Sequence, residues 1–414
     1  MASAVLILGA GQAGFQVAAS LREKGFAGTV TLVGDEPHLP YQRPPLSKGY
    51  LALSPLPDVL IRHEKFYQDN RIELRTGARA TAIDRTRHAV ALTTGEMLQY
   101  DHLVLATGGR NRQLSLEGTD IDGVLSLRHL DDADRLRQRL QDAGRIVIIG
   151  GGYIGLEVGS LALALGLETC IVEAAPRLVA RVASTELSEF FHRHYEKAGA
   201  RILCGTTPAR IQGSAGHADS VQLANGEVIP TKLVLICVGI LPNVELAEGA
   251  GLEVANGIVV DQFLRTSDPS IYAVGDCARY PSRHAGGELV RVESVPNATD
   301  QGRAVAEAIL GRPKPFESLP WFWSEQGKLR LQIAGLIQGH DRAIVKGDPA
   351  SGTFSVFCFR GPTLVGVESM NRPVDFVAAR RALTEGLPIT AEEVANAAFD
   401  LKSRVGPLRP AAAA

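Results

Sequence analysis

The sequence predicts an α/β protein with two similar parallel-sheet domains and a third, α+β domain at its C-terminal end. The first observation is an apolar run, Val5 to Leu8, followed by glycines and then by apolar residues at helical spacing from Phe15 to Leu21. A second apolar run, Thr29 to Val33, completes a strand–helix–strand unit. The second observation is that the same order of elements recurs from Arg145 onward. We therefore expect two parallel sheets.

The repeat begins with a strand from Arg145 to Ile149 and a glycine turn from Gly150 to Gly155. A helix from Leu156 to Leu165 and a strand from Thr169 to Val172 follow. A strand, glycine turn and helix in this order are typical of a Rossmann-like dinucleotide-binding domain, so two such domains are predicted.

The remaining segments predict antiparallel structure. Thr94-Gly95 and Asn225-Gly226 are turn dipeptides that favour hairpins laid over the main sheets. Beyond Pro313 the pattern changes to alternating strands and then helices, which is typical of an α+β domain. The strands expected there are Lys328 to Ala334, Ala343 to Lys346, Phe354 to Phe359 and Leu364 to Ser369.

Length and composition limit the class of protein. The chain has 414 residues, 45% hydrophobic and 21% charged, which is typical of a globular protein with two or three domains. A formal charge of −2 provides no general attraction for nucleic acid or anionic membranes. No apolar run approaches the roughly 20 residues of a membrane-spanning helix, and Met1 to Ala10 lacks a basic start. A cytoplasmic protein is expected.

The cysteines indicate neither a metal site nor a redox disulfide. Five occur, far apart and without a CxxC pair: Cys170, Cys204, Cys237, Cys277 and Cys358. Most lie in or beside apolar runs, where a buried, inert thiol is the usual role.

The first glycine turn contains Gly9, Gly11 and Gly14. The first glycine permits the tight turn, the second lets a pyrophosphate approach the backbone, and the third lets helix and strand pack closely. Asp35, 21 residues after Gly14, ends the next strand, where a carboxylate can accept hydrogen bonds from a ribose.

The second glycine turn contains Gly150, Gly152 and Gly155, and Glu173 ends its next strand. A carboxylate there accepts a ribose 2′-hydroxyl and repels a 2′-phosphate, which favours NADH over NADPH. Arg177 and Arg181 lie close enough in sequence to bind a phosphate, although a solvated helix face also accounts for them.

Two further segments indicate which domain holds a flavin. Leu103 to Ala106 is an apolar strand ending in Thr107-Gly108-Gly109, and Ile271 to Val274 is another ending in Gly275-Asp276. Each alone also fits an ordinary strand and turn. Together with the first fingerprint, they resemble the ATG and GD segments that flank FAD in the flavoprotein disulfide reductase-like superfamily.

Longer strings resemble one family within it, the ferredoxin reductases of the putidaredoxin reductase and palustrisredoxin reductase type. The resemblance covers nearly all of residues 4 to 405 and implies a glutathione-reductase-like architecture. The strings are RPPLSK from Arg43, LATGGR from Leu105, GGGYIGLE from Gly150, TSDPSIYAVGDCA from Thr266, ESVPNATDQ from Glu293 and PWFWS from Pro320.

The resemblance implies roles for individual residues. Asp35 would hold the adenosine ribose of FAD, Lys48 would lie near flavin N5, and Asp276 would bind the ribitol. Val295, at the start of an expected helix from Pro296 to Leu310, would offer a backbone contact to the pyrimidine end of the ring. The implied FAD-binding residues are Gly9, Gly11, Gly14, Asp35, Lys48, Ala80, Thr107, Gly108, Arg128, Asp276 and Val295; those for NADH are Gly150, Gly152, Tyr153, Ile154, Gly155, Glu173 and Gly239.

Lys48 and Glu157 are the candidate catalytic residues. Glu157 follows the second glycine turn, on the helix that lies nearest the flavin in this family, so the two side chains could form an ion pair near N5. The alternative is a surface salt bridge worth under about 1 kcal/mol.

The route by which electrons leave also depends on the resemblance. Relatives that reduce disulfides carry a reactive cysteine after the second strand, and residues 36 to 62 contain none. Trp323 would lie near the flavin edge where an acidic 2Fe-2S ferredoxin docks, and Arg303 matches a docking arginine of the family. A core position is the alternative for both tryptophans: it is as open as docking for Trp323 and is favoured for Trp321. Arg62, Lys328 and Arg330 are further basic candidates.

The predicted domains are an FAD domain of residues 1–112 and 244–322, an NADH domain of residues 113–243, and a C-terminal domain of residues 323–405, with a frayed tail from 406 to 414. The expected function is hydride transfer from NADH to FAD and single-electron transfer to a ferredoxin that feeds a heme-thiolate monooxygenase. Alternatives are a Rieske-type dioxygenase system, a rubredoxin or a quinone-like acceptor, or an NADH-sensing interaction protein like apoptosis-inducing factor. Nothing requires more than a monomer.

Overall fold

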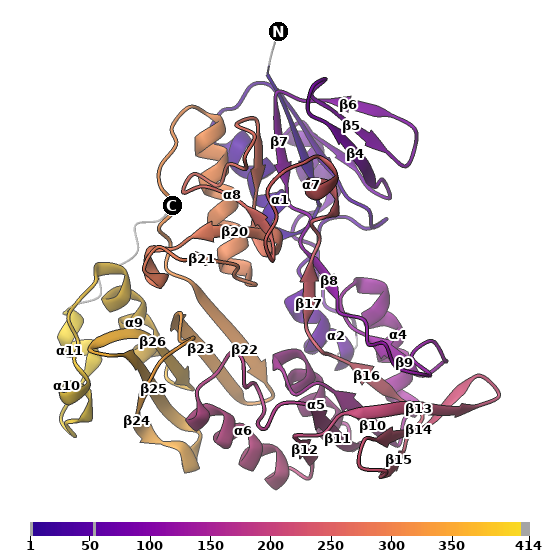
Figure 1. The fold of residues 1–414 in the computed structure, drawn as a ribbon, viewed down its shortest axis with the longest axis vertical. Helices are drawn as coiled ribbons and strands as arrows, with labels where there is room; N and C mark the ends of the chain where they lie inside the picture. The colour runs from indigo at the N-terminus through magenta and orange to yellow at the C-terminus, as the bar shows by residue number, and fades with distance from the viewer. Residues whose placement is uncertain (1–2, 53–54, 407–414) are drawn as a thin grey trace. The chain divides into compact units, whose positions relative to one another are not determined.

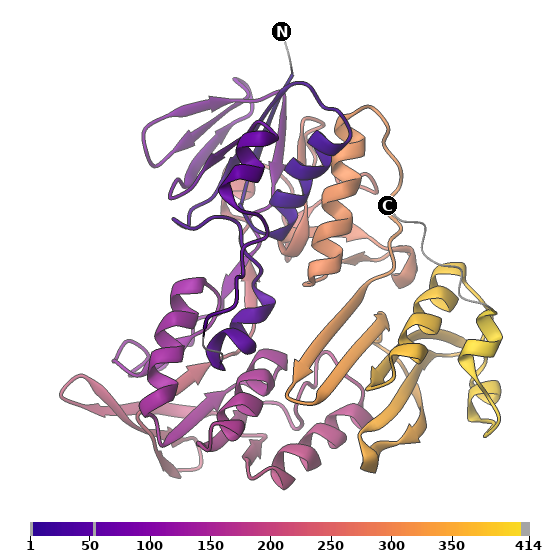
Figure 2. The same ribbon diagram turned by 180° about the vertical axis from the view of Figure 1, so that it is seen from behind.

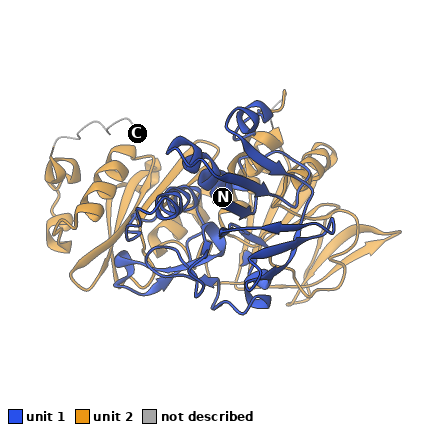
Figure 3. Cartoon of the chain, turned by 90° about the horizontal axis from the view of Figure 1, so that it is seen from above, with its two compact units in different colours: residues 1–42, 58–110, 240–320 blue, residues 43–57, 111–239, 321–414 orange. Residues whose placement is uncertain are grey.

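The computed structural model describes residues 3–52 and 55–406, so the expected tail from Pro407 to Ala414 lies outside the described residues. The α/β prediction is confirmed, with two parallel sheets and an antiparallel C-terminal sheet. The chain forms two compact units (Figure 3): residues 1–42, 58–110 and 240–320 make unit 1, and residues 43–57, 111–239 and 321–414 make unit 2.

Unit 1 is built on a five-stranded parallel sheet in the order β19-β7-β1-β2-β3. Its strands are β1 (Ala4–Leu8), β2 (Thr29–Val33), β3 (Ile72–Arg75), β7 (His102–Leu105) and β19 (Ile271–Ala273). Val5, Leu6, Ile7 and Leu8 are all buried, because helices or loops cover both faces of a parallel sheet.

Helices α1 (Gln12–Glu23) and α8 (Val295–Ile309) pack side by side in unit 1 (Figures 1 and 2). Their close approach depends on Gly302, where a Cβ atom would lie 2.8 Å from Gln16 Cβ. The unit also contains α3 (Glu64–Asp69), α7 (Glu245–Gly249), an antiparallel sheet of β4 (Ala80–Asp84), β5 (Ala89–Leu92) and β6 (Met97–Gln99), and a small sheet of β18 (Ile258–Val259), β20 (Ala278–Pro281) and β21 (Leu289–Val290). The strands β8 (Gly109–Asn111) and β17 (Ile240–Pro242) pair with each other.

Unit 2 repeats the parallel arrangement in the order β12-β11-β10-β16-β9. Its strands are β9 (Val124–Ser126), β10 (Arg145–Ile149), β11 (Glu168–Glu173), β12 (Arg201–Cys204) and β16 (Val234–Ile236), and its helices are α2 (Gly49–Ala52), α4 (Leu130–Asp142), α5 (Tyr153–Ala164) and α6 (Thr185–Lys197). The hairpin predicted at Asn225-Gly226 is confirmed, since β14 (His217–Leu223) pairs antiparallel with β15 (Val228–Pro230) and with β13 (Pro208–Ser214).

The C-terminal part of unit 2 is a five-stranded antiparallel sheet in the order β22-β23-β26-β25-β24. Four of its strands were predicted: β23 (Leu329–Gly335), β24 (Arg342–Asp348), β25 (Thr353–Arg360) and β26 (Thr363–Met370). The strand β22 (Trp321–Gln326) was missed, because its aromatic residues point to both faces and hide the alternation of a strand. Helices α9 (Pro373–Glu385), α10 (Ala391–Ala395) and α11 (Leu401–Val405) follow.

The structure divides into two compact units, whereas the sequence predicts three domains. Residues 43–57, which carry Lys48, group with unit 2, although they lie within the sequence range expected for the FAD domain. The predicted domain boundaries therefore stay a prediction, and the units are used below to describe where each residue lies.

Candidate functional site

The first glycine turn lies in unit 1, between β1 and α1. Gly9 has φ +115°, and its amide donates to Val33 O at 2.8 Å. Gly11 begins α1 without any side-chain cap. Because the first N–H groups of a helix lack intrahelical acceptors, they are available for a phosphate.

The space for a side chain differs among the three glycines of this turn. A Cβ atom at Gly9 would lie 2.1 Å from Ala106 O, and one at Gly14 would lie 1.9 Å from Gly9 O. A Cβ atom at Gly11 would meet nothing within 4 Å among the described residues. Gly9 and Gly14 are therefore required by the fold, whereas Gly11 borders open space, which fits a pyrophosphate of FAD.

The Asp35 carboxylate lies at the end of β2 and is exposed. It makes no hydrogen bond to any described residue, which leaves its oxygens available to a ribose. The backbone before it is well held, because Gly34 N donates to Arg75 O at 2.8 Å and Ala78 N donates to Gly34 O at 3.0 Å.

Two further turns of unit 1 carry predicted FAD residues and are braced by residues for which the sequence indicated no role. Thr107 Oγ1 donates to Asn243 O at 2.7 Å, and Asn243 Nδ2 donates back to Thr107 O at 2.9 Å. The Gly275 amide, next to Asp276, donates to the buried Gln301 Oε1 at 2.7 Å. The only sequence signal for Gln301 was its place at the end of the ESVPNATDQ string.

The remaining predicted FAD positions of unit 1 are backbone positions. Val295 is the first residue of α8, where Ser294 caps the helix by accepting a hydrogen bond from Asn297 N at 3.2 Å. Ala80 begins β4 and pairs with Leu92. Their roles toward FAD stay predictions.

The second glycine turn lies in unit 2 and repeats the first. Gly150 has φ +111°, and its amide donates to Val172 O at 2.8 Å. A Cβ atom at Gly150 would lie 2.3 Å from Cys237 O, and one at Gly155 would lie 2.2 Å from Gly150 O. Gly152 is the N-cap residue of α5 and provides no side-chain cap, and a Cβ atom there would meet no described atom within 4 Å. This open position fits a second dinucleotide.

Glu173 and Arg177 make different contacts beside this turn. Glu173 Oε2 accepts from Gly151 N at 2.6 Å, and Oε1 accepts from Ala175 N at 2.7 Å. These bonds place a carboxylate directly beside the turn. Arg177, by contrast, donates to the carbonyl oxygens of Ala180 at 3.0 Å and of Ala183 at 3.0 Å. Its guanidinium braces the loop instead of facing a phosphate.

The other predicted NADH residues of unit 2 lie around the same turn. Tyr153 begins α5, and its ring lies 4.8 Å from that of Phe322. Ile154 is 39% exposed, which is unusual for a large aliphatic side chain in the first turn of a helix and fits contact with a ligand. Gly239 has φ +96°, and Arg181 Nη2 lies 3.2 Å from the position of its absent Cβ atom.

The Lys48–Glu157 contact is present in unit 2. Lys48 Nζ lies 2.8 Å from Glu157 Oε2, and the side chains are only 18% and 5% exposed, so the alternative of a surface salt bridge is excluded. Glu157 also accepts hydrogen bonds from the Ser47 hydroxyl and, at 2.6 Å on Oε1, from Ser324 Oγ. Neither serine was singled out from the sequence, although Ser47 lies in the RPPLSK string and Ser324 ends the PWFWS string, both of which carried the resemblance.

Arg128 lies in the same unit, close to the segment that carries Lys48. Arg43 Nη1 donates to Arg128 O at 2.7 Å, and the amide of Arg128 donates to Asp132 Oδ2 at 3.0 Å. These bonds tie the segment before Lys48 to the start of α4.

The predicted docking residues fall in different units. Trp323 lies on β22 in unit 2, 5.7 Å from the Trp321 ring, and Trp321 packs on Phe376 and under Arg380. Arg303 lies on α8 in unit 1, with its side chain 60% exposed and Asp300 3.8 Å away. Arg62, Lys328 and Arg330 are exposed. Their role in docking stays a prediction.

Three of the five cysteines, Cys170, Cys277 and Cys358, are buried. Among the described residues all five cysteines are free, and burial raises the pKa of Cys170 to about 11 and of Cys237 to about 12. The described part of the chain contains no cluster of metal-ligating side chains. None of its described helices has the length and apolarity needed to cross a membrane.

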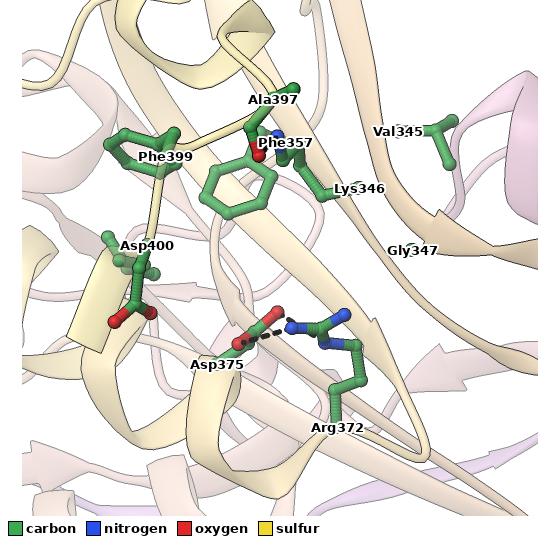
Figure 4. Close-up of a pocket in the computed structure, with 10 residues that line it drawn as sticks. Val345, Lys346, Gly347, Phe357, Arg372, Asp375, Ala397, Phe399 and Asp400 are labelled. Carbon is green, nitrogen blue, oxygen red and sulfur yellow. Dashed lines mark hydrogen bonds and ion pairs between the residues drawn. The ribbon is translucent and has the colours of Figure 1, made fainter. Parts of the chain in front are cut away.

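A hollow of about 380 Å³ lies beside β24 in the C-terminal part of unit 2 (Figure 4). Its charged side chains are satisfied by the protein: Arg372 Nε pairs with Asp375 Oδ2 at 2.7 Å, and Lys346 Nζ donates to Asn396 O at 2.7 Å. Since these charges already have partners, we assign no ligand to this hollow.

The fold and the two glycine turns are typical of a protein with two dinucleotide-binding domains. Residues 3–302 match the pyridine nucleotide-disulphide oxidoreductase family, and residues 321–405 match the reductase C-terminal family. Rhodocoxin reductase of Rhodococcus erythropolis is 46% identical over 399 residues, which are 96% of this chain and 93% of that protein.

Two solved structures extend this likeness to the fold. The ferredoxin reductase for the CYP199A2 system of Rhodopseudomonas palustris has a TM-score of 0.95 at 47% identity, covering 98% of this chain and all of that one. The reductase in the covalent putidaredoxin reductase–putidaredoxin complex has a TM-score of 0.93 at 39% identity, covering 97% and 98%. The chain therefore belongs to the pyridine nucleotide-disulphide oxidoreductase family, as an FAD-dependent ferredoxin–NAD(P)+ reductase.

Proposed function

We propose that this reductase oxidises NADH and passes electrons singly, through FAD, to a 2Fe-2S ferredoxin that feeds a heme-thiolate monooxygenase. The observation that carries the proposal is the same open glycine turn, built once in each unit at Gly11 and at Gly152. Two turns of this kind support two dinucleotides, and a hydride donor with a flavin is the pair that the family uses.

The choice of NADH is supported by the second turn. The Glu173 carboxylate, held by Gly151 N and Ala175 N, can accept a ribose 2′-hydroxyl and would repel a 2′-phosphate. Arg177 is occupied by backbone carbonyls, so it does not offset that repulsion.

FAD, when bound, would accept one hydride, which carries two electrons, from a nicotinamide and would release these electrons one at a time. No general acid or base is needed for that transfer, so the task of the chain's residues is to position and to tune. In unit 1, Gly9, Gly11 and Gly14 would hold the pyrophosphate and Asp35 the ribose. In unit 2, Lys48 would supply a positive charge near flavin N5, and Glu157 would fix the direction of that charge.

The acceptor is supported by the relatives and by the cysteines. Residues 36–62 contain no cysteine, so no dithiol relay follows the second strand as it does in disulfide reductases. The similar proteins named above are reductases for rhodocoxin, for the CYP199A2 system and for putidaredoxin. The ferredoxin reductase component of the p-cumate 2,3-dioxygenase system of Pseudomonas putida is 35% identical over 97% of this chain, so a dioxygenase system is the second candidate.

The test is turnover with purified components. With FAD and NADH, cytochrome c reduction should require an added electron carrier, and a 2Fe-2S ferredoxin with four cysteine ligands should support it better than a rubredoxin or a Rieske-type ferredoxin, whose 2Fe-2S cluster has two histidine ligands. NADH-driven dimerisation with negligible turnover would instead support the interaction protein. Equal turnover with all three carriers would contradict the proposed acceptor.

Salt separates docking from chemistry in the same assay. An acidic ferredoxin that meets a basic docking surface should be reduced more slowly as ionic strength rises, because charges separated by more than roughly 10 Å are screened at 0.1 M salt. Ferricyanide reduction by the same enzyme serves as the control for hydride transfer. Equal salt dependence of both reactions would remove electrostatic docking from the proposal.

A further inference from the structure

We propose that Ser324, Gln326 and Tyr195 are positioning residues, which form a one-way hydrogen-bond chain that holds the Glu157 carboxylate and, through it, the Lys48 ammonium. The inference rests on the proposed function in one respect, namely that Lys48 acts near the flavin. The contacts themselves all lie within unit 2.

The chain of contacts is continuous from α6 to Lys48. The Tyr195 hydroxyl lies 2.8 Å from Gln326 Oε1, Gln326 Nε2 lies 3.2 Å from Ser324 Oγ, and Ser324 Oγ lies 2.6 Å from Glu157 Oε1. The other oxygen of Glu157 receives Lys48 Nζ at 2.8 Å. Tyr195 also lies 2.6 Å from Leu156 O, next to Glu157 in α5.

The direction of the chain follows from the donors and acceptors available. The Glu157 carboxylate can only accept, so the Ser324 proton goes to it and Gln326 must turn Nε2, which can only donate, toward Ser324 and Oε1 toward the Tyr195 hydroxyl. Ser324 Oγ then accepts one hydrogen bond and must donate its own proton to Glu157. Burial raises the pKa of Tyr195, so its hydroxyl keeps its one proton, which Gln326 Oε1 at 2.8 Å shares with Leu156 O at 2.6 Å.

Burial increases the effect of losing one donor from this hydrogen-bond chain. Tyr195, Ser324 and Gln326 are each at most 2% exposed, so water cannot replace a lost donor. A buried carboxylate needs hydrogen bonds to stay charged, and each hydrogen bond to a charged group is stronger than one between neutral groups. Losing the Ser324 donor would therefore leave Glu157 Oε1 without a partner and weaken its hold on Lys48.

The strand β22 has two faces with different tasks. Successive residues of a strand point to opposite sides. Phe322, Ser324 and Gln326 face α5 and α6, where Phe322 meets Tyr153 and Gln326 meets Tyr195. Trp321 and Trp323 face the other way, where Trp321 meets Phe376 of α9. The strand that carries the predicted docking tryptophan thus also supports Glu157.

The test is the rate of flavin reduction by NADH in stopped flow. Ser324→Ala should slow it about tenfold, as expected for one lost hydrogen bond to a charged group, with little change in NADH affinity. Ser324→Thr, which keeps the hydroxyl, should restore the rate.

Matched variants separate the outcomes. Ser355→Ala removes another buried serine that donates to a carboxylate, Asp375 at 2.8 Å, on a strand of the same sheet, and it should leave the rate unchanged. Gln326→Met, which keeps a similar side-chain volume, should slow flavin reduction less than Ser324→Ala does. If Ser324→Ala does not bind flavin, Gln326→Met is used in its place. Flavin content and melting temperature verify folding.

Lys48→Met distinguishes this inference from the proposed function. If Lys48→Met slows reduction while Ser324→Ala and Gln326→Met keep the parent rate, the positioning chain is wrong and the role of Lys48 stands. If Lys48→Met itself keeps the parent rate, the proposed role of Lys48 is wrong.

Discussion

The two glycine turns are built alike, but the acidic residue behind each occupies a different position. Gly9 N donates to Val33 O and Gly150 N donates to Val172 O, so Val33 and Val172 are equivalent. Glu173 is therefore equivalent to Gly34, and Asp35 lies one residue further along. Glu173 is the last residue of β11, whereas Asp35 lies two residues beyond the end of β2, outside the strand.

This shift changes what each acid does for the protein. Glu173 folds back on its own turn and accepts from Gly151 N, and a Cβ atom at residue 151 would lie 2.5 Å from Leu178 Cδ2. In unit 1 the small residue is Gly34 instead, where a Cβ atom would lie 2.7 Å from Ala10 Cβ. Two fingerprints that look the same in sequence thus differ: one acid braces its turn, and the other is exposed.

The largest effects are expected where the two turns are the same. Gly9→Ala should yield protein without flavin, and Gly150→Ala should keep flavin but lose its reduction by NADH. Each new Cβ atom would lie within 2.3 Å of a carbonyl oxygen at a positive φ, a combination that costs at least about 3 kcal/mol. The flavin-to-protein absorbance ratio and an NADH titration measure the two outcomes.

Gly25→Ala and Gly166→Ala are the controls for these two variants. Both residues have a positive φ, +83° and +82°, but no described atom lies within 4 Å of the added Cβ. They should cost about 1 kcal/mol and leave both cofactors bound. NADH reduction of Gly150→Ala at the parent rate would contradict the equivalence of the turns.

The next effect concerns an anchor of the segment that follows Glu173. Buried Glu368 on β26 accepts hydrogen bonds from the amide of Ser184 at 3.1 Å and from its hydroxyl. Burial raises the pKa of Glu368 to about 7; the Ser184 hydrogen bonds and Arg177 act against this shift, and Glu186 adds to it. An unfolded glutamate has a pKa of about 4.3, so the stabilisation by protonated Glu368 is complete below that pH and is lost as the pH rises to about 7.

Glu368→Gln removes this titration. As the pH rises from about 5 to about 8, the parent should lose roughly 3 kcal/mol of stability, whereas the variant should not. The melting temperature of the variant should therefore rise relative to that of the parent by on the order of 5 °C. Glu189→Gln, a side chain 61% exposed on α6, controls for the change of charge. The same pH trend in both variants would rule out Glu368 as its source.

A smaller effect should distinguish the two acids directly. Glu173→Ala should lower kcat/KM for NADH about tenfold and narrow the preference over NADPH, since it removes a ribose acceptor together with the brace of Gly151 N. Asp35→Ala should weaken FAD binding less than tenfold, because an exposed carboxylate contributes less. Ferricyanide reduction and flavin fluorescence measure these changes. If the fold-loss in kcat/KM of Glu173→Ala equals the fold-loss in FAD binding of Asp35→Ala, the two acids do not differ in the way proposed.

The smallest effect on cofactor choice is expected at Arg177. Arg177→Ala should leave the NADH to NADPH ratio within about twofold, because the guanidinium bonds to the carbonyls of Ala180, Ala183 and Ser184. It should lower the melting temperature by a few degrees for a loss of about 1.5 kcal/mol. Arg181→Ala, at an exposed position, is the control for the change in melting temperature. A gain in NADPH use by Arg177→Ala would show that it faces the ribose.

Local patterns account for the elements that were predicted correctly. The strand at Arg145–Ile149 and the hairpin at Asn225-Gly226 depend on neighbouring residues only, through apolar runs and turn sterics. β22 was missed because its local pattern is not that of a strand. Its aromatic residues pack on both faces, and their partners lie in α5 and α9. Its sheet neighbour β23 follows it directly, yet the alternation that marks a strand is absent from WFWSEQ.

By itself, the sequence determined the two glycine turns, the parallel sheets and the family, because a positive φ or a tight backbone approach restricts a position to glycine whatever its surroundings. Only the tertiary structure decided how the acids and the lysine are used. Glu157 meets Lys48 across 109 residues of chain and Ser324 across 167, and Glu173 reaches Gly151 rather than solvent. Such contacts depend on burial and on distances between distant segments, which no local pattern of residues records.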